Sequence, residues 1–473
     1  MNATPSLSPS PDILDRLKGL VGAGGWSDDP ARLLPKLTEW RDRWVGTTPL
    51  LLLPRTVEAV SAIVRLCAET GTALTPQGGN TGLVGGQIPQ GEVLLSLERL
   101  NRVRDVAPDD DVIVAEAGVT LAALHDAASE AGRFFPLSLA SEGSCTVGGL
   151  VSTNAGGTAV LRYGTMRDLV LGLEAVLPSG EVFAGLKRLR KDNTGYDLKQ
   201  LLIGAEGTLG VVTAASLKLL PILPDRAVAV AAVPSPADAI ALLHLAKVMS
   251  GGAVEAFELM NRAGVAFAVK NLPGLREPLA SPSPWTVLIE LAGAKGSGQA
   301  ARMEAMLAEA LAAGLISDAS LAQSQTQARA FWAVREGQSA GQKPEGAAWK
   351  HDISVPVSRV ADFIGEATAA VTALAPGVRV VAFGHVGDGN IHYDVIRPDG
   401  APDAPHNARR DEGARLVHDI AAGMDGSISA EHGLGTMKSL EALRYKPSQD
   451  IAAMRAIRAA LDPARIMNPR VLF

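Results

Sequence analysis

TPQGGNTGLVGGQIP, residues 75–89, is the most informative stretch for the fold, because it places five glycines among small polar residues. Glycine adopts positive φ and lets backbone N–H groups approach an anion, which builds a concave nest for phosphate. Two later segments repeat this chemistry, SEGSCTVGGLVSTNAGGTAVLRYG (141–164) and GAEGTLGVVT (204–213). None of the three matches the Rossmann fingerprint or the P-loop. One such segment alone is typical of tight turns, whereas three together favour a large cofactor that contains a diphosphate.

Composition sets the broad class. The chain has 473 residues, of which 47% are hydrophobic and 20% charged, as in an ordinary globular protein of two or three domains. A formal charge of −6 gives no footprint for nucleic acid. With only Cys67 and Cys145 present, a disulfide framework and a Cys-ligated iron–sulfur cluster are both excluded. The N-terminus lacks signal-peptide features and no apolar run approaches a membrane span, so we expect a cytoplasmic protein.

The first half of the chain mixes helical and strand patterns. We expect a disordered Ser- and Pro-rich tail at 1–12 and a helix from near Asp12. Apolar spacing predicts a helix at 56–70, a strand at 112–119, and two strands around a turn within 170–183.

Near Pro221–Pro224 the pattern changes to a regular alternation of strands and helices. The order β-α-β-β-α predicts a ferredoxin-like sheet with helices on one face. The expected strands are 227–233, 253–260 and 285–293, and the expected helices are 235–249 and 297–314. The whole chain is therefore predicted to be α+β.

Histidines gather in GHVGDGNIHYDV (384–395), which reads as a hairpin around Asp388-Gly389. A two-residue turn there places His385 directly opposite His392, with Cβ atoms roughly 5 Å apart. Two imidazoles at that separation can chelate one metal ion. Asp394 shares a face with His392, because side chains alternate along a strand.

A third metal ligand must come from elsewhere in the chain. SAEHGLG (429–435) offers Glu431 and His432 as the candidates. For any one of these histidines, the simpler interpretation is that it caps a strand or completes a polar core. That interpretation does not suit the facing pair taken together with Glu431-His432.

Six motifs, in this order, resemble the FAD-linked oxidases of the vanillyl-alcohol oxidase type, and specifically the D-2-hydroxyglutarate/D-lactate dehydrogenase branch. The resemblance spans roughly residues 45–470. The motifs are PQGGNTGLVGG, KDNTGYDLKQLLIGAEGTLGVVT (191–213), WKHDISVP (349–356), FGHVGDGNIHYDV, SAEHGLG and LDPARIMNP (461–469).

The resemblance implies a PCMH-type FAD-binding domain of two α+β subdomains, with an inserted ferredoxin-like substrate domain and a C-terminal segment that returns to the flavin. We expect a lead-in at 1–44, the FAD domain at 45–224, the substrate domain at 225–425 and the completing segment at 426–473.

The resemblance also implies which residues hold FAD. Pyrophosphate contacts are expected at Gly78, Gly79, Asn80, Thr81 and Gly82, with Ser144, Thr146, Gly149 and Val212 beside the adenine and isoalloxazine and Asn468 arriving from the tail. Further contacts are expected at Pro76, Ser141, Gly143, Asn154, Gly156, Glu206 and Gly207. Some relatives attach the flavin through a histidine in the first loop. Residues 75–89 contain none, so we expect non-covalent FAD.

Oxidation of a 2-hydroxy acid requires loss of the hydroxyl proton and transfer of the C2 hydride, and a cation can polarise the hydroxyl oxygen. His385, His392 and Glu431 form a ligand set that suits Zn²⁺, with Mn²⁺ or Fe²⁺ also compatible. His432 is then the expected general base, since its ordinary pKa near 6.5 suits that work.

By resemblance, Arg335, Ser339 and Lys350 align with residues that hold the distal carboxylate of the substrate. Arg335 and Ser339 are one helical turn apart, which predicts a shared face. A diacid uses this second anchor, so we expect D-2-hydroxyglutarate oxidised to 2-oxoglutarate. Many relatives carry Asn where this chain has Asp394, which is expected to contact the substrate and repel its carboxylate, or to assist the metal.

Three alternatives stay open on the sequence. The substrate can be D-lactate or another D-2-hydroxy monoacid; the His/Glu set can belong to a zinc hydrolase without flavin; or the chain can be a non-catalytic flavin-binding protein. For the dehydrogenase we expect a separate electron acceptor, an electron-transfer flavoprotein or a quinone, and a possible homodimer.

Overall fold

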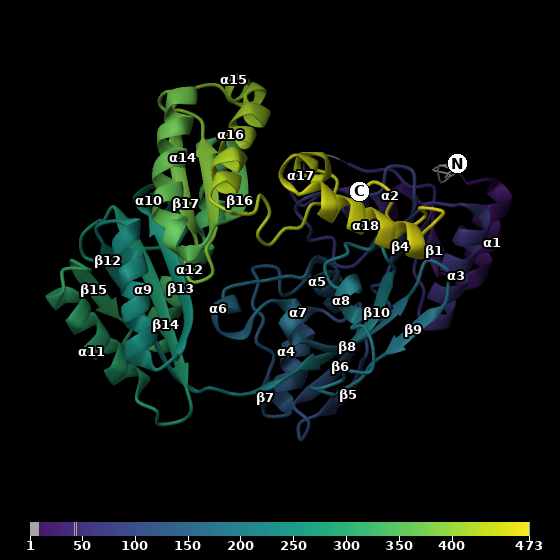
Figure 1. Ribbon diagram of the computed structural model, residues 1–473, viewed down its shortest axis with the longest axis horizontal. Coiled ribbons are helices and arrows are strands. Elements are labelled where there is room, and N and C mark those ends of the chain that lie inside the picture. The colour runs from purple at the N-terminus through teal and green to yellow at the C-terminus, as the bar shows by residue number, and fades with distance from the viewer. Residues whose placement is uncertain (1–8, 42, 44, 473) are drawn as a thin grey trace. The chain divides into compact units, whose positions relative to one another are not determined.

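The computed structural model describes residues 9–41, 43 and 45–472, so most of the expected disordered tail lies outside the described residues. The chain forms two compact units (Figure 1). Unit 1 contains residues up to Gly157, Tyr163–Pro221 and Glu431–Phe473. Unit 2 contains Thr158–Arg162 and Ile222–Ala430. The short helix α6 (Val160–Tyr163) spans a boundary between these segments.

The first sheet of unit 1 has the strand order β1-β2-β4-β3. Its strands are β1 (Trp26–Ser27), β2 (Leu51–Leu52), β3 (Leu74–Gln77) and β4 (Val93–Ser96), with helices α1 (Pro11–Val21), α2 (Pro30–Leu37) and α3 (Val57–Thr70). Because β1 pairs with β2, the segment expected to be only a lead-in contributes to this sheet. The C-terminal tail returns here: Ile466 and Met467 are buried in the same core, and the amide of Leu74 donates to the carbonyl of Ile466.

The second sheet of unit 1 has the order β5-β6-β10-β8-β9. Its strands are β5 (Val103–Ala107), β6 (Val112–Glu116), β8 (Val170–Val176), β9 (Val182–Gly185) and β10 (Val211–Lys218); a two-stranded sheet adds β7 (Arg133–Phe134) and β11 (Leu220–Pro221). The helices are α4 (Leu121–Glu130), α5 (Val147–Thr153), α7 (Met166–Leu169), α8 (Lys199–Leu202), α17 (Ser439–Tyr445) and α18 (Ser448–Leu461). The helix and strands expected at 56–70, 112–119 and 170–183 are thus present.

Unit 2 is built on one seven-stranded sheet, in the order β15-β12-β14-β13-β17-β18-β16. The first four strands have the ferredoxin-like order that the sequence predicts. The strands are β12 (Asp225–Val233), β13 (Val254–Asn261), β14 (Trp285–Gly293), β15 (Asp318–Leu321), β16 (Ala348–Ser354), β17 (Arg379–His385) and β18 (Asn390–Ile396).

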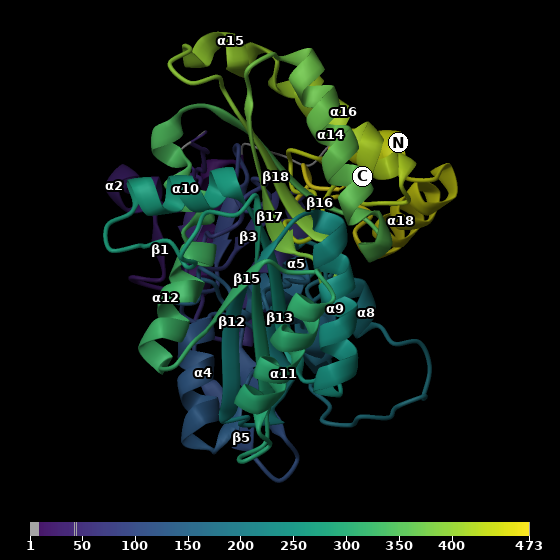
Figure 2. The ribbon, with the colours of Figure 1, turned by 90° about the vertical axis from the view of Figure 1, so that its left-hand side faces the viewer.

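The two faces of this sheet carry different helices (Figure 2). One core packs α9 (Pro236–Ser250), α11 (Gln299–Ala312), α14 (Val360–Leu374) and α16 (Arg410–Gly423) on one face; a smaller core packs α10 (Arg262–Asn271) and α12 (Gln325–Glu336) on the other. The remaining helices are α13 (Gln338–Gly341), η1 (Lys343–Glu345), η2 (Val357–Arg359) and α15 (Asp403–Ala408). The two helices that the sequence predicted, α9 and α11, pack in the same core on one face, as expected, and α10 and α12 add helices on the other face.

Among the described residues, no helix is both long enough and apolar enough to cross a membrane.

Candidate active site

In unit 1 the first glycine-rich loop packs closely on the second. A Cβ added at Gly79 would lie 1.8 Å from the carbonyl oxygen of Ser144, and one at Gly78 would lie 2.4 Å from Oγ1 of Thr146. Any side chain at these two positions would collide, so the glycines are required for the two backbones to meet. At Gly207, φ is +73°, and an added Cβ would lie 2.6 Å from Pro76. The backbones of the three glycine-rich segments therefore approach one another close to β3.

Several polar atoms in this region are buried without a hydrogen-bond partner, including Oγ1 of Thr75 and Oε1 of Gln77 on β3, Oγ1 of Thr146 and Oδ1 of Asn468. Asn468 is held in place because its Nδ2 donates to the carbonyls of Gly86 (2.9 Å) and Glu206 (2.8 Å). Leaving a buried polar atom unpaired costs about 1–3 kcal/mol, which a bound polar cofactor would recover. The residues present therefore fit a diphosphate-containing group such as FAD.

Three further expected flavin contacts also use their side chains within the protein. The amide of Asn80 donates to the carbonyl of Thr38 (3.0 Å), and Oδ1 of Asn154 accepts the backbone N–H of Arg167 (2.8 Å). The carboxylate of Glu206 accepts the backbone N–H groups of Leu434 (2.9 Å) and Gly435 (2.7 Å). The remaining expected contacts lie on these loops, on helix α5 (Gly149) or on strand β10 (Val212); those on the loops are Thr81, Gly82, Ser141, Gly143 and Gly156.

Glu206 thus anchors the backbone of the EHGLG motif, a role that the sequence did not indicate. Burial raises the pKa of Glu206, while the two backbone donors and the charge of Lys438 oppose that rise. A Cβ added at Gly433, where φ is +75°, would lie 2.9 Å from its carboxylate.

In unit 2 the histidine hairpin has a different register from the one that a two-residue turn predicts. Phe383, not His385, lies opposite His392. The connection is longer because the amides of Asp388 and Gly389 both bond to the carbonyl of His385. A shift of two residues keeps the same face of the strand. The two imidazoles still approach, with ring centroids 5.9 Å apart.

His385 instead lies opposite Glu258 of β13. Its Nδ1 is 2.6 Å from Oε1 of Glu258, and Oε2 of the same carboxylate accepts Nε–H of Arg335 at 2.6 Å. Glu258 is fully buried. Burial by itself would raise its pKa, but the charges of Arg335 and His385 outweigh that effect and lower it to about 2. Sequence reasoning missed Glu258, whose only signal is a carboxylate inside the apolar run AVEAFELM.

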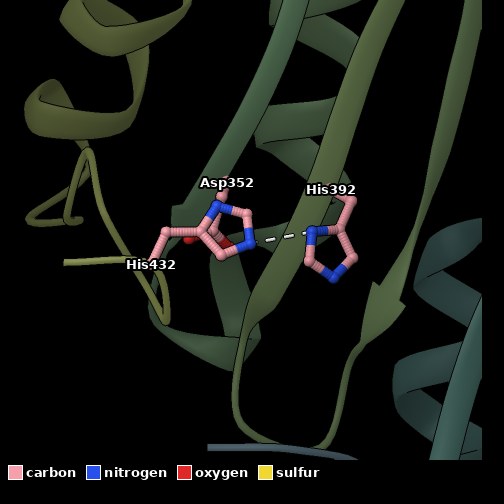
Figure 3. A group of neighbouring side chains, drawn as sticks. All are labelled: Asp352, His392 and His432. Carbon is pink, nitrogen blue, oxygen red and sulfur yellow. Dashed lines mark ion pairs between the residues drawn. The ribbon is translucent and has the colours of Figure 1, made fainter. Parts of the chain in front are cut away.

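Within the part of the chain that the structure describes, two groups of side chains bring possible metal-ligand atoms within 4.8 Å of one another: His385, His392 and Glu431, and Asp352, His392 and His432. Figure 3 shows the second group, with the 3.7 Å ion pair between Nδ1 of His392 and Oδ1 of Asp352 dashed. Glu431 and His432 follow directly on Ala430, whose amide donates to the carbonyl of Asp352. Chain continuity therefore places them beside β16. Asp352 was not expected in the site.

The expected substrate anchors lie on α12, α13 and β16. Arg335 is buried near the end of α12, and Ser339 is exposed in α13, the short helix that follows. The backbone at Gly337 between them keeps helical angles, and their shared face stays a prediction. Lys350 of β16 lies opposite Asp394 of β18, with Nζ 2.8 Å from Oδ2.

Comparison with known proteins gives two matches along the chain, and the second covers most of unit 2 together with the C-terminal segment of unit 1. Residues 222–472 match the family described as FAD linked oxidases, C-terminal domain, and residues 48–184 match the FAD binding domain. The chain is 40% identical over 463 residues to mitochondrial D-2-hydroxyglutarate dehydrogenase of Bos taurus, covering 97% of this chain and 83% of that protein. It is 37% identical to D-2-hydroxyglutarate dehydrogenase of Xanthomonas citri pv. viticola, covering 98% and 97%.

The fold is similar to that of p-cresol methylhydroxylase solved with substrate bound, with a TM-score of 0.76 at 16% identity, covering 99% of this chain and 98% of that one. The expected α+β fold of the PCMH type is thereby confirmed. The chain belongs to the FAD-linked oxidases and carries their FAD-binding domain. Within that family it falls in the D-2-hydroxyacid dehydrogenase branch, as its motifs indicated.

Proposed function

We propose that this protein oxidises D-2-hydroxyglutarate to 2-oxoglutarate with FAD and a divalent cation, most suitably Zn²⁺. The observation that carries the proposal is the cluster of His385, His392 and Glu431 beside a buried Arg335, in a chain with an FAD-binding domain. The names of the full-length relatives support the same substrate.

The donor set fits a catalytic cation. Two imidazole nitrogens and one carboxylate oxygen are the ligands of many zinc enzymes that keep a position open. Since Nδ1 of His385 is engaged by Glu258, Nε2 is the nitrogen that we expect to bind. A carboxylate on the far side of a ligating imidazole fixes its tautomer and raises its basicity. Oδ1 of Asp352 lies 3.7 Å from Nδ1 of His392, close enough for charge attraction but beyond hydrogen-bond distance. A cation held here would polarise the substrate hydroxyl.

His432 is the residue that we propose to take the hydroxyl proton. It lies next to Glu431 in the chain, and one of its ring nitrogens is within 4.8 Å of ligand atoms of Asp352 and His392. The neutral imidazole of an ordinary histidine accepts a proton near pH 7. A bound FAD would supply the acceptor for the hydride from C2. The residues proposed to hold it are the glycine loops with Thr146 and Asn468, whose unpaired atoms support this assignment.

Arg335 is the proposed anchor for the distal carboxylate. Its Nε–H donates to the carboxylate of Glu258, which orients the guanidinium. Its Cζ lies 5.0 Å from the ring centroid of Phe383. Arginine is suited to such a role because its remaining donors match a carboxylate. An acid without a distal carboxylate, such as D-lactate, is the second candidate substrate.

We further propose that FAD is bound non-covalently and that electrons pass to a separate acceptor. A flavin-free zinc hydrolase would give the matched FAD-binding domain no role. The expected cytoplasmic location and the homodimer stay predictions.

The test is an anaerobic screen of purified yellow protein against D- and L-2-hydroxy acids, read by bleaching of the flavin absorbance. We expect D-2-hydroxyglutarate to bleach it and the L-isomer not to. A colourless protein that cannot be reconstituted with FAD would contradict the proposal.

A further inference from the structure

Lys350 and Asp394 face each other on the sheet surface that carries the histidines. In the β16–β18 pairing, Lys350 lies opposite Asp394 and Asp352 lies opposite His392. Since side chains alternate along a strand, His392 and Asp394 project from the same face, separated by about 7 Å of strand. That is the length scale of a five-carbon acid. A 2-hydroxy acid whose hydroxyl end lies at His392 can therefore place its distal end at this pair.

The pair is a closed ion pair. Nζ of Lys350 lies 2.8 Å from Oδ2 of Asp394 and 3.2 Å from Oε1 of Gln342. Asp394 is only 3% exposed, and its neighbour across β17 is the apolar Val381. A carboxylate removed from water in this way requires a cation beside it. Lys350 supplies that cation.

The charge balance at the distal end follows directly. Lys350 alone would offer a full positive charge to a second substrate carboxylate. When Lys350 is paired with Asp394, the two together form a dipole. The attraction of a dipole for an anion decreases with distance much faster than that of a single charge. The second cation, Arg335, is likewise paired with a buried carboxylate, Glu258. The two anchors and their two partners together carry no net charge.

We propose that Asp394 is a specificity-determining residue that cancels the charge of Lys350, so that the site accepts D-2-hydroxy acids with an uncharged distal end nearly as well as the diacid. This inference rests on the proposed function and deepens it: the substrate class is five-carbon D-2-hydroxy acids, with weak selection for a distal carboxylate. Arg335 retains some preference for the diacid, and Asp394 limits that preference.

The experiment compares D-2-hydroxyglutarate with D-2-hydroxyvalerate, which has the same carbon chain without the distal carboxylate. Anaerobic flavin reduction is followed by stopped flow in the holoenzyme, and the second-order rate constants give a diacid-to-monoacid ratio. We expect the ratio to be below about tenfold in the native chain. In Asp394→Asn it should rise by about tenfold or more, because single charges a few ångströms apart in a half-buried site interact strongly.

Lys350→Met is the second variant, and its effect should be opposite. It leaves the carboxylate of Asp394 facing the distal end, so the ratio should fall at least tenfold. Glu290→Gln is the matched control: Glu290 of β14 is a buried carboxylate paired with Arg226 and Trp332, and its loss should leave the ratio unchanged. The ratio does not depend on the fraction of folded enzyme, since both acids are oxidised by the same molecules.

A ratio in Asp394→Asn within twofold of the native value would overturn the inference. If that variant does not fold, an unchanged ratio in Lys350→Met would overturn it equally. Failure of both acids to reduce the native flavin is a different result: it contradicts the proposed function, and this inference with it.

Discussion

Glu258 and His385 lie opposite each other on neighbouring strands, with the carboxylate Oε1 2.6 Å from Nδ1 of the imidazole. The other oxygen of the same carboxylate accepts Nε–H of Arg335. One buried group therefore orients both a candidate metal ligand and the candidate substrate anchor. This makes Glu258 a positioning residue for two steps of the proposed reaction.

Glu258→Gln should weaken zinc binding about 10- to 100-fold, the usual effect of losing a carboxylate behind a ligating histidine. Zinc affinity is measured by competition with a chromophoric chelator, without turnover. Glu290→Gln controls for the loss of a buried carboxylate in the same sheet. Native zinc affinity in Glu258→Gln would show that the pair has only a structural role.

Glu206→Gln should loosen the 433–435 backbone, because an amide can accept only one of the two N–H groups that the carboxylate now accepts. Hydrogen exchange at Leu434 and Gly435 should accelerate at least tenfold. The amide of Leu74, bonded to Ile466 in the same unit, serves as the internal reference and should keep its protection. Unchanged exchange at both loop amides would refute the anchoring role.

Arg458 fixes the C-terminal tail, donating to the carbonyls of Met467 (2.8 Å) and Val471 (2.6 Å). Burial, with the charge of Arg465, lowers its pKa to about 10, so it is still charged near pH 7. Arg458→Met should weaken FAD binding about tenfold, since Asn468 lies between these carbonyls. Fluorescence of released flavin measures this. Arg455→Met, exposed on the same helix, should retain native affinity; equal losses in both variants would contradict the prediction.

Glu345 ties η1 to Lys270, Asn271 and Arg379. Burial tends to raise its pKa, but these three partners outweigh it and lower the value to about 2, against 4.5 for the unfolded chain. A depressed carboxyl pKa stabilises the fold fully above about pH 4.5, and the stabilisation is lost as the pH falls toward 2.

The Tm of Glu345→Gln should therefore lie below the native Tm at pH 7, and the gap should narrow by a few degrees at pH 3.5, corresponding to ~1 kcal/mol. Differential scanning calorimetry at both pH values measures the gap. A gap of constant size would mean that the carboxylate contributes no acid-dependent stability.

Local patterns predicted the individual elements well. α9 begins where the sequence places it, because Ser235 caps the backbone N–H of Asp238 and Pro236 occupies the first turn. The glycine segments were informative for the same reason. Glycine is needed there because of the local backbone geometry, and that need is visible in the local sequence.

Long-range pairing was not predictable in the same way. Glu258 binds Arg335, which is 77 residues away in the sequence, and His385, which is 127 residues away. No residue near Glu258 in the sequence indicates either partner. The predicted hairpin register was wrong for two reasons. β17 also pairs with β13, which fixes its position in the sheet. In addition, the backbone at Gly384 lies so close to the carbonyl of Asn390 that an added Cβ would be 2.5 Å from its oxygen. Asp352 entered the site through its pairing with β18.

Single-turnover flavin reduction decides whether a cation held by His385, His392 and Glu431 assists the oxidation of a D-2-hydroxy acid by FAD. Anaerobic D-2-hydroxyglutarate is mixed with native protein, chelator-treated protein and His392→Ala, each with matched FAD content. We expect rapid bleaching in the native protein, a rate at least a hundredfold lower in the other two, and recovery on adding Zn²⁺ to the chelated protein alone. Bleaching at the native rate in chelated protein and in His392→Ala would contradict this expectation.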